Sequence, residues 1–371
     1  AQMALLCNSF GQTKLVFLPK ISEACNAKIY VKLENTNPGG GSIKDRVSLN
    51  LIETAEKEGK LKPGGTVVEG TGGNTGLGIV TVANAKGYKS ILCMPEAISK
   101  SKIAHMRALG ADVRLCPPVP PTDDAHYAKM AKMLGQGDNT FHTDQFLNLA
   151  NMEAHVKTTG PEVFSQMEQI GEQNIDCFCA AAGTGGTIAG VGKYLKSRDS
   201  AIHVILNDCD GSCLKRYIGE GEILPRDGES GTTAEGIGCG RLTGNFAEAR
   251  KYIDGAISIS DAESIAVAFF LLQHEGIFAG PSAALNVAGA MKNAIFLQQS
   301  RGIECPVVVT IICDGGASYL EKAYSPTWRA EKGFAGCEVI PPGGTIMDLL
   351  DSGNYVPKAS DDKFEGHVGG S

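Results

Sequence analysis

The chain has 371 residues, with 34 basic and 41 acidic side chains and a formal net charge of −7. A single core stops growing at roughly 250–300 residues, so this length predicts two domains. The hydrophobic fraction of 43% excludes a disordered chain, and mild acidity without a basic stripe excludes nucleic-acid and anionic-membrane partners. The composition favours a globular protein that acts on small molecules.

Strand-like and helical segments alternate along the chain, which predicts an α/β protein with parallel sheets. The first series comprises strand 27–33, helix 44–58, strand 65–69, helix 74–86, strand 90–94, helix 99–109, strand 112–115 and helix 124–134. The second comprises helix 160–169, strand 176–182, helix 187–196, strand 203–207, helices 261–274 and 282–298, and strand 306–313. A glycine-dense stretch, 208–244, interrupts the second series and is predicted to be a functional loop.

Neither a membrane span nor a secretion signal is expected. No apolar stretch reaches the roughly 18–20 residues that cross a bilayer, and no basic residue precedes the short apolar run near the N-terminus. We therefore expect a cytoplasmic protein. The twelve cysteines lack CxxC spacing and histidine partners, which predicts reduced thiols and no metal site. Cys177 and Cys179 are predicted to share one face of a buried strand.

A lysine begins one of the predicted helices, after the glycine-rich segment NPGGGSIKDR. Ser42 is placed to cap that helix and Asp45 follows three residues later, as in a capping box. Lys44 falls in the first turn, where the helix dipole disfavours a cation. Such a lysine is a candidate nucleophile, although a surface lysine beside a glycine loop is the simpler alternative when the segment is considered alone.

Two further glycine-rich turns lie between a predicted strand and a predicted helix. EGTGGNTGLG, residues 69–78, brings backbone N–H groups and the hydroxyls of Thr71 and Thr75 to a helix start, where an anion binds favourably. GTGGT, residues 183–187, has the same character and suits a phosphate. Together with Lys44, these turns predict a phosphate-bearing aldehyde held as a Schiff base and a substrate carboxylate. Pyridoxal 5'-phosphate is the cofactor that meets these requirements.

A nicotinamide cofactor is the competing prediction for the turn at 183–187, because a strand ending near Asp208 follows at the spacing of a dinucleotide fold. However, Ile188 stands where the fingerprint requires Gly or Ala, and this alternative gives Lys44 no role. A P-loop is excluded because the chain contains no GxxxxGK[ST] segment.

From about residue 11 to residue 334, the sequence resembles the cysteine synthase and cystathionine β-synthase family of fold type II pyridoxal-phosphate enzymes. NPGGGSIKDR is similar to the family's NPGGSVKDR, GTGGNTG to TSGNTG, and GTGGT matches the phosphate loop. QFLNLANMEAHVKTTGPE, DCDGSCLKRY and AEGIGCGRLTGNF also have counterparts. The resemblance implies two doubly wound α/β domains with the cofactor in the cleft between them, and a homodimer.

The resemblance also implies roles for individual residues. Lys44 would be the catalytic Schiff-base lysine. The cofactor would contact Asn74, Gly183, Thr184, Gly185, Gly186, Thr187, Ser282 and Gly315. The amino-acid substrate would contact Thr71, Gly72, Gly73, Thr75 and Gln145. The mouth loops, 208–217 and 234–246, also carry the cations Arg216, Lys215 and Arg241, whose charge suits a carboxylated second substrate. Solvated surface charges are the alternative for those cations.

Three positions depart from the family pattern. Gly72 stands where the family has Ser or another small residue, which is expected to open space for a larger nucleophile. Gly315 replaces the Ser that meets the pyridine nitrogen, so water, Ser282 or Asp314 must meet that nitrogen or it goes unpaired. In GPSAALN, Ala283 and Ala284 stand where serine and glycine are usual. A less protonated ring favours β-elimination over racemisation or transamination.

The predicted activity is β-replacement on O-acetylserine or a similar serine ester through an aminoacrylate, with sulfide as the family's usual nucleophile. An amino-acid amine such as aspartate, forming a C–N bond in aminopolycarboxylate biosynthesis, is the first alternative. A catalytically weakened regulatory or scaffold protein is the second. The expected domains are 1–44 with 156–332, a small mobile domain at 45–155, and a loosely packed or disordered tail at 333–371.

Overall fold

The protein was examined as a computed structural model that describes residues 6–223, 232–351, 353 and 355–364. The chain divides into two compact units, each built from two stretches of sequence. Unit 1 consists of Ala1–Thr13 and Thr36–Thr158, and unit 2 of Lys14–Asn35 and Thr159–Ser371. Among the described residues, no helix has the length and apolar character needed to cross a membrane.

Unit 1 contains a four-stranded, wholly parallel sheet in the order β5-β4-β3-β6. Its strands are β3 (Thr66–Gly70), β4 (Lys89–Pro95), β5 (Asp112–Cys116) and β6 (Thr140–His142). Its helices are α2 (Lys44–Lys57), α3 (Asn74–Lys86), α4 (Lys100–Ala108), α5 (Tyr127–Leu134) and α6 (Ala150–Ala154). Val67 packs in a cluster with residues of α3, whereas Val68 packs in a cluster with Ala131 of α5. Because neighbouring strand residues point to opposite faces, helices bury both faces of this sheet.

Unit 2 contains a seven-stranded sheet in the order β1-β2-β10-β7-β8-β9-β11, with a parallel centre and an antiparallel strand at each edge. Its strands are β1 (Leu15–Phe17), β2 (Lys28–Leu33), β7 (Cys177–Ala181), β8 (His203–Cys209), β9 (Gly255–Ile259), β10 (Val307–Ile312) and β11 (Val356–Pro357). Its helices are α1 (Pro19–Cys25), α7 (Gly160–Gln169), α8 (Gly186–Arg198), α9 (Leu214–Glu220), α10 (Gly244–Ala249), α11 (Asp261–Phe270), α12 (Pro281–Arg301) and α13 (Pro326–Glu331).

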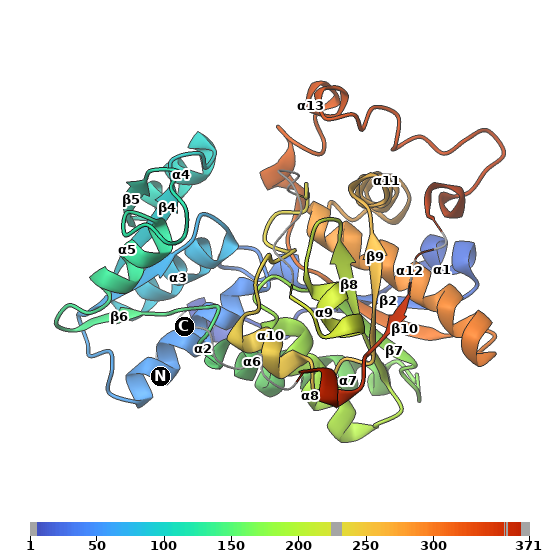
Figure 1. Ribbon diagram of the computed structural model, residues 1–371, viewed down its shortest axis with the longest axis horizontal. Coiled ribbons are helices and arrows are strands. Elements are labelled where there is room, and N and C mark those ends of the chain that lie inside the picture. The colour runs from blue at the N-terminus through green and yellow to red at the C-terminus, as the bar shows by residue number, and fades with distance from the viewer. Residues whose placement is uncertain (1–5, 224–231, 352, 354, 365–371) are drawn as a thin grey trace. The chain divides into compact units, whose positions relative to one another are not determined.

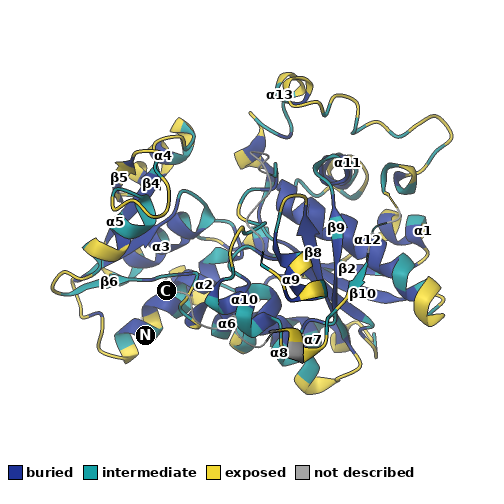
Figure 2. Cartoon of the chain, in the orientation of Figure 1, coloured by how far each residue is buried: buried dark blue, intermediate teal, exposed yellow. Residues whose placement is uncertain are grey.

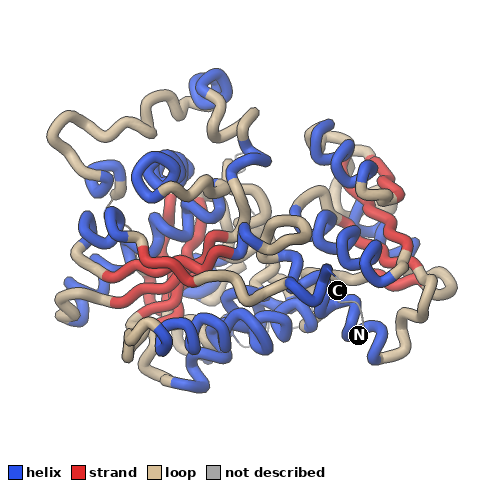
Figure 3. The backbone as a smooth tube through the Cα atoms, turned by 180° about the vertical axis from the view of Figure 1, so that it is seen from behind, coloured by secondary structure: helices blue, strands red, loops and turns tan. Residues whose placement is uncertain are grey.

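Helices also cover both faces of the seven-stranded sheet. Figures 1 and 3 show α11 and α12 on one face, and α7 and α8 on the other. The central strands and α12 are buried, whereas exposed residues gather on the outer turns and around α13 (Figure 2). Two sheets, each enclosed by helices, confirm the predicted α/β class with two α/β parts.

Short 3-10 or π segments complete the chain. They are η1 (Leu6–Ser9), η2 (Glu34–Thr36), η3 (His155–Thr159), η4 (Leu271–Glu275), η5 (Gly316–Tyr319), η6 (Ile346–Leu349) and η7 (Asp361–Phe364). The π segment η4 continues α11, so the predicted helix 261–274 changes its hydrogen-bonding pattern in its last turn. The stretch predicted as one long loop, 208–244, contains α9 and the start of α10.

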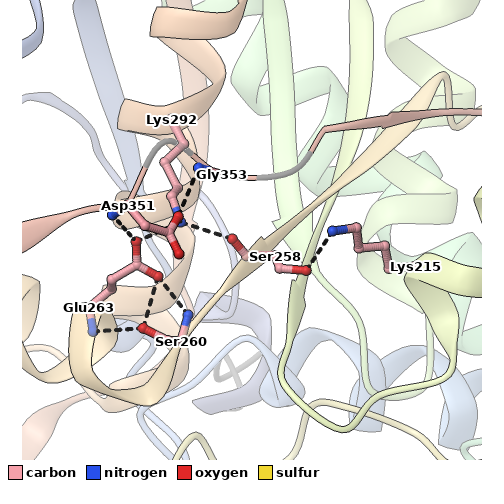
Figure 4. A network of polar contacts seen from close by, with 7 residues as sticks. All are labelled: Lys215, Ser258, Ser260, Glu263, Lys292, Asp351 and Gly353. Carbon is pink, nitrogen blue, oxygen red and sulfur yellow. Dashed lines mark hydrogen bonds and ion pairs between the residues drawn. The ribbon is translucent and has the colours of Figure 1, made fainter.

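Residues of the C-terminal segment contact the rest of unit 2, and Figure 4 shows Asp351 beside Lys292 and Glu263. Lys292, buried in the middle of α12, lies 2.5 Å from Glu263 Oε1 and 2.5 Å from Asp351 Oδ1, and donates to Ser258 O at 3.0 Å. Ile346 is buried, and β11 pairs with β9 at the edge of the sheet. The polar composition of this segment gave no sign of these contacts, because they form with residues far away in the sequence.

Candidate functional site

Lys44 is the first residue of α2, where the sequence predicts it. Its backbone N–H donates to Ser42 Oγ at 3.2 Å, and the Ser42 N–H donates to Asp45 Oδ2 at 3.2 Å. The return contact from Asp45 matches a capping box, but the residue that precedes the helix is Ile43 rather than Ser42. These short-range bonds fix the backbone at Lys44, while its side chain is half-buried.

A close approach of two helices places Lys44 beside the second glycine-rich turn. A Cβ atom at Gly78, in α3, would lie 2.6 Å from Ser48 Oγ and 3.0 Å from the carbonyl oxygen of Lys44. Only glycine allows α2 and α3 to pack at this distance. The start of α2 with Lys44 therefore packs closely against α3 within unit 1.

The turn at 71–75 lies at the carboxyl end of β3 and is tied to Gln145. Thr71 donates its N–H to Cys93 O at 2.8 Å, and Gly73 donates to Thr71 Oγ1 at 3.2 Å. Thr75 Oγ1 donates to Gln145 Oε1 at 2.6 Å, although the two residues are 70 positions apart. Thr71, Thr75 and Gln145 are all at least 90% buried. The structure thus brings together the residues predicted to bind a substrate carboxylate.

The space expected beside Gly72 is already filled, so that expectation is wrong. A Cβ atom at Gly72 would lie 2.5 Å from Ile98 Cδ1 and 2.6 Å from Ile98 Cγ1. Ile98 follows β4 and packs, half-buried, against the core of unit 1. An apolar side chain from another loop therefore occupies the volume that the family's serine would take, and the glycine gives a nucleophile no extra room.

In unit 2, the third turn connects β7 to α8. Gly185 has φ +86°, in the left-handed region, and a Cβ there would lie 2.6 Å from the backbone of Phe246. Thr243 Oγ1 donates to Thr184 O at 2.6 Å, and Cys239 Sγ donates to Gly183 O at 2.8 Å. The segment after residue 236 therefore braces the turn while the N-terminus of the 13-residue α8 follows it.

The turn at 183–187, called the phosphate cradle below, has residues that fit a phosphate group. A Cβ at Gly183 would collide with the carbonyl oxygen of Gly236, so a larger side chain cannot replace the first glycine. Gly186 begins α8, and Thr184 and Thr187 flank it. Backbone N–H groups at a helix start and side-chain hydroxyls donate to phosphate in proteins, and small residues let the phosphate approach them.

Ser282 and Gly315 come from different elements of unit 2. Ser282 is buried in the first turn of α12, which begins next to Gly280, and Gly280 donates its N–H to Asp314 O at 3.1 Å. A Cβ at Gly315 would meet nothing closer than Phe278 O at 3.8 Å. Room for a hydroxyl-bearing side chain therefore exists at Gly315.

Asp314 faces a tyrosine of the same segment. Tyr319 donates its hydroxyl to Asp314 Oδ2 at 2.7 Å, and both residues are buried. Burial, followed by the nearby Asp314 carboxylate, raises the pKa of the Tyr319 phenol well above its usual range. Tyr319 therefore stays a hydrogen-bond donor to Asp314.

The cations of the mouth loops have partners of their own. Arg216 is exposed and lies 2.9 Å from Glu220 Oε2. Lys215 Nζ donates to Ser258 Oγ at 2.8 Å, and its backbone N–H donates to Asp208 Oδ2 at 2.7 Å (Figure 4 shows the side-chain contact). Burial lowers the pKa of Lys215 and raises that of Asp208 to about 6. Arg241 is exposed. These contacts give no support to a built carboxylate site at the mouth loops.

Sequence reasoning missed two buried residues that hold these turns in place. Glu69, the residue before Gly70 at the end of β3, accepts hydrogen bonds beneath the turn at 71–75. Asn286 of α12 accepts from Ala181 N at 2.7 Å and donates to Ile311 O at 2.9 Å, which ties β7 to β10 below the phosphate cradle. The sequence pattern that could have indicated Glu69 is a single acidic residue at the end of the apolar segment TVVE.

The structure places all twelve cysteines in the described part of the chain, and none of them forms a disulfide. Cys177 and Cys179 are both fully buried in β7, on one face of the strand. Within residues 6–223, 232–351, 353 and 355–364, no group of three His, Cys, Asp or Glu side chains is placed to hold a metal ion.

Residues 6–314 match the family described as "Pyridoxal-phosphate dependent enzyme". Among proteins of known name, cysteine synthase 1 of Neurospora crassa is 40% identical over 334 residues, which cover 89% of this chain and 86% of that protein. A putative mitochondrial cysteine synthase of Saccharomyces cerevisiae is 39% identical over 348 residues, with 89% and 86% covered.

A solved structure has a similar fold. The crystal structure of an O-ureido-L-serine synthase superposes with a TM-score of 0.75 at 29% sequence identity, and the match covers 87% of this chain and 95% of that one. A likeness of this extent includes both units.

Proposed function

Because this chain belongs to the pyridoxal-phosphate dependent enzyme family and is a cysteine-synthase-like β-replacement enzyme, we propose that it converts O-acetylserine or a similar serine ester with sulfide as the second substrate. The observation that carries this proposal is the pairing of Thr75 with Gln145 beside the turn at 71–75. The pairing would hold the buried turn in one conformation, so that its N–H groups and the Thr71 hydroxyl could receive the carboxylate of an amino acid. The named cysteine synthases supply the choice of ester and nucleophile.

The residues of the two units have complementary roles in this proposal. Gly183–Thr187 would hold the cofactor phosphate, Asn74 would meet its ring hydroxyl, and Ser282 and Gly315 would border its ring nitrogen. When bound, pyridoxal 5'-phosphate stabilises negative charge at the substrate α-carbon, so that a β-substituent can leave. The Lys44 amine would hold the cofactor covalently and, once displaced by the substrate amine, would take the α-proton.

Thr71, Gly72, Gly73, Thr75 and Gln145 would bind and orient the substrate. The Thr75 hydroxyl already donates to Gln145, so the donors to a carboxylate would be the Thr71 hydroxyl and N–H groups of the turn, and their burial makes each such bond stronger than it would be in water. Holding the carboxylate orients the α-proton toward Lys44 and the β-substituent away from it. The apolar side chain of Ile98 limits the volume at this side of the turn.

A different nucleophile is the second candidate. The similar solved structure is that of an O-ureido-L-serine synthase, so the product in its name is not cysteine. The aspartate-type amine is less favoured, since Ile98 fills the space beside Gly72 and Arg216 lies against Glu220.

A nucleophile screen tests the choice. Holoenzyme and O-acetylserine are incubated with sulfide, hydroxyurea or aspartate, and the products are identified by mass spectrometry. We expect cysteine from sulfide as the main product. Efficient turnover of aspartate or hydroxyurea together with slow turnover of sulfide would overturn the proposed nucleophile.

The scaffold alternative predicts a different result for the cofactor. A scaffold that had lost the reaction would show no change in visible absorption when O-acetylserine is added to the purified protein. We expect a change in wild type, and expect Lys44→Ala to lose the wild-type absorption band. An unchanged band in Lys44→Ala would contradict the assignment of the lysine.

Three further expectations stay proposals. The functional domains are proposed to be 1–44 with 156–332 and a mobile part at 45–155, although the compact units divide the chain at different residues near its N-terminus. The homodimer is proposed because it is usual in this family, and sedimentation would check it. The cytoplasmic location has to be checked by imaging a tagged protein, since one similar protein is named as mitochondrial.

A further inference from the structure

A buried carboxylate lies directly beneath the turn at 71–75. Glu69, at the carboxyl end of β3, is 2% exposed. Its Oε1 accepts from the Gly70 N–H at 2.8 Å. Its Oε2 accepts from the Gln145 N–H at 3.1 Å and from the hydroxyl of Thr143. Acidic side chains are rarely this buried unless their oxygens are satisfied, and here three donors from two chain segments satisfy them.

These bonds close a ring that joins three structural elements. β3 and β6 are adjacent parallel strands, so their carboxyl ends lie side by side, and Glu69 bridges them. Gln145 then accepts from Thr75 in the first turn of α3 at 2.6 Å, and the chain from Thr75 returns through the turn to Glu69. Asn151 Nδ2 donates to Gln145 O at 2.9 Å and fixes the remaining side of Gln145.

Burying the ionised carboxylate of Glu69 at this position costs folding free energy. Burial raises its pKa to about 7, which means that the ionised carboxylate is disfavoured there. An apolar side chain of similar size would fill the volume but would leave the Gly70 and Gln145 N–H groups without this acceptor, so the carboxylate serves to hold those two groups. The contacts of Glu69 lead to the backbone of Gln145, which belongs to the proposed substrate site, and to Gly70, which directly precedes the turn at 71–75.

Resting on the β-replacement function proposed above, we propose that Glu69 is a positioning residue for the substrate carboxylate. Its two oxygens hold the Gly70 and Gln145 N–H groups, so that Gln145 stays against Thr75 and the turn at 71–75 keeps its donors aimed at one place. Glu69 itself does not touch substrate. It acts through Gln145, and its effect is on substrate binding rather than on cofactor loading.

The test compares Glu69→Gln with a matched control in the same unit. A glutamine keeps the size but offers only one acceptor oxygen, so it cannot hold both N–H groups. Glu56→Gln is the control, because Glu56 accepts from Tyr88 at 2.7 Å and from Lys86 at 2.9 Å, apart from the substrate turn. Each variant is loaded with pyridoxal phosphate and assayed for visible absorption, thermal unfolding, and KM and kcat.

The binding probe is L-alanine, which carries the amino-acid carboxylate and has no β-leaving group. We expect Glu69→Gln to raise the L-alanine dissociation constant, followed by absorption, and the KM for O-acetylserine by about 10- to 100-fold. The KM for sulfide and the absorption of the loaded enzyme stay at their wild-type values. Glu56→Gln alters thermal unfolding alone. In the protein without cofactor, hydrogen exchange of residues 70–78 is faster in Glu69→Gln than in Glu56→Gln.

A double variant separates positioning from a general effect on the fold. If Glu69 acts through Gln145, the Glu69→Gln change adds little to L-alanine binding once Gln145→Ala is present. Should Glu69→Gln not fold, Thr143→Val removes one donor to the same carboxylate, and we expect about a 3- to 10-fold weaker binding of L-alanine. Wild-type L-alanine affinity in the folded variants, or full additivity with Gln145→Ala, would overturn the proposal.

A failure of the role proposed for Glu69 can be distinguished from a failure of the proposed reaction. If the wild-type enzyme turns over no serine ester but binds L-alanine, and Glu69→Gln weakens that binding, the proposed reaction fails and the role of Glu69 stands. If O-acetylserine is turned over equally well by wild type and Glu69→Gln, the reaction stands and the positioning role fails.

Discussion

The contact between Gly72 and Ile98 gives a quantitative prediction about the substrate turn. The perturbation is Gly72→Ser, which introduces the residue type that the family carries at this position. Its Cβ would lie 2.5 Å from Ile98 Cδ1 and 2.6 Å from Ile98 Cγ1, well inside van der Waals contact. Either Ile98 leaves its place against the core of unit 1, or the turn shifts.

The magnitude follows from that geometry. Overpacking of this kind typically costs about 1–3 kcal/mol. Ile98→Ala alone loses part of a half-buried apolar side chain, about 1–2 kcal/mol of the free energy of unfolding. In Ile98→Ala the clash is gone, so the added cost of Gly72→Ser falls to below about 0.5 kcal/mol. We therefore expect a favourable coupling of about 1–2 kcal/mol between the two substitutions.

The assay is a double-mutant cycle on denaturant-induced unfolding of the holoenzyme, with KM for O-acetylserine measured in parallel. Gly72→Ser is expected to raise KM because the turn is displaced, and Ile98→Ala is expected to restore it in the double variant. Additive unfolding free energies within about 0.5 kcal/mol would refute the reasoning, since they would mean that the two side chains do not compete for one volume.

Three more outcomes are expected. Gly315→Ser fills open space, so the free energy of unfolding changes by less than about 0.5 kcal/mol while the absorption spectrum of the loaded enzyme shifts, as spectroscopy of the two forms would show. Lys292→Met leaves the buried Glu263 without its cation and is expected to cost about 3–5 kcal/mol in denaturant-induced unfolding, whereas Asp351→Asn, at an exposed side chain, costs far less. Burial raises the pKa of Glu69 to about 7, so between about pH 4.5 and 7 the folded protein retains a proton that the unfolded chain releases. The contribution of Glu69 to the free energy of unfolding therefore falls as the pH rises through this range. Glu69→Gln is expected to flatten this part of a measured profile of stability against pH.

Local patterns in the sequence were sufficient for the elements that carry the site. Helices α3 and α7 begin and end at the predicted residues, and α2 begins at the predicted Lys44. These segments combine apolar periodicity with glycine at their boundaries, and both signals act within a few residues. The short strands β1, β6, β9 and β11 had no such signal, because their position in the sheet depends on neighbours from other parts of the chain.

Contacts between distant segments decided what the sequence could not. The sequence predicted Gln145 only through the family resemblance, and its bond to Thr75 spans 70 residues. The volume beside Gly72 depends on Ile98, which lies on a separate loop, so the glycine alone suggested space that does not exist. Arg216 lies against Glu220, one helical turn further along α9, within a stretch that was predicted as loop.

The sequence by itself determined that this protein has two α/β parts, a lysine at a helix start and glycine-rich turns before helices, because strand–helix alternation and small residues express backbone geometry locally. Only the tertiary structure decided how two of those turns are held: Glu69 bridges the segments that end β3 and β6, and Asn286 ties β7 to β10. It also decided that Lys292 of α12 binds Asp351 of the C-terminal segment. Buried polar groups need partners, and which partner is in reach is settled when distant segments pack together.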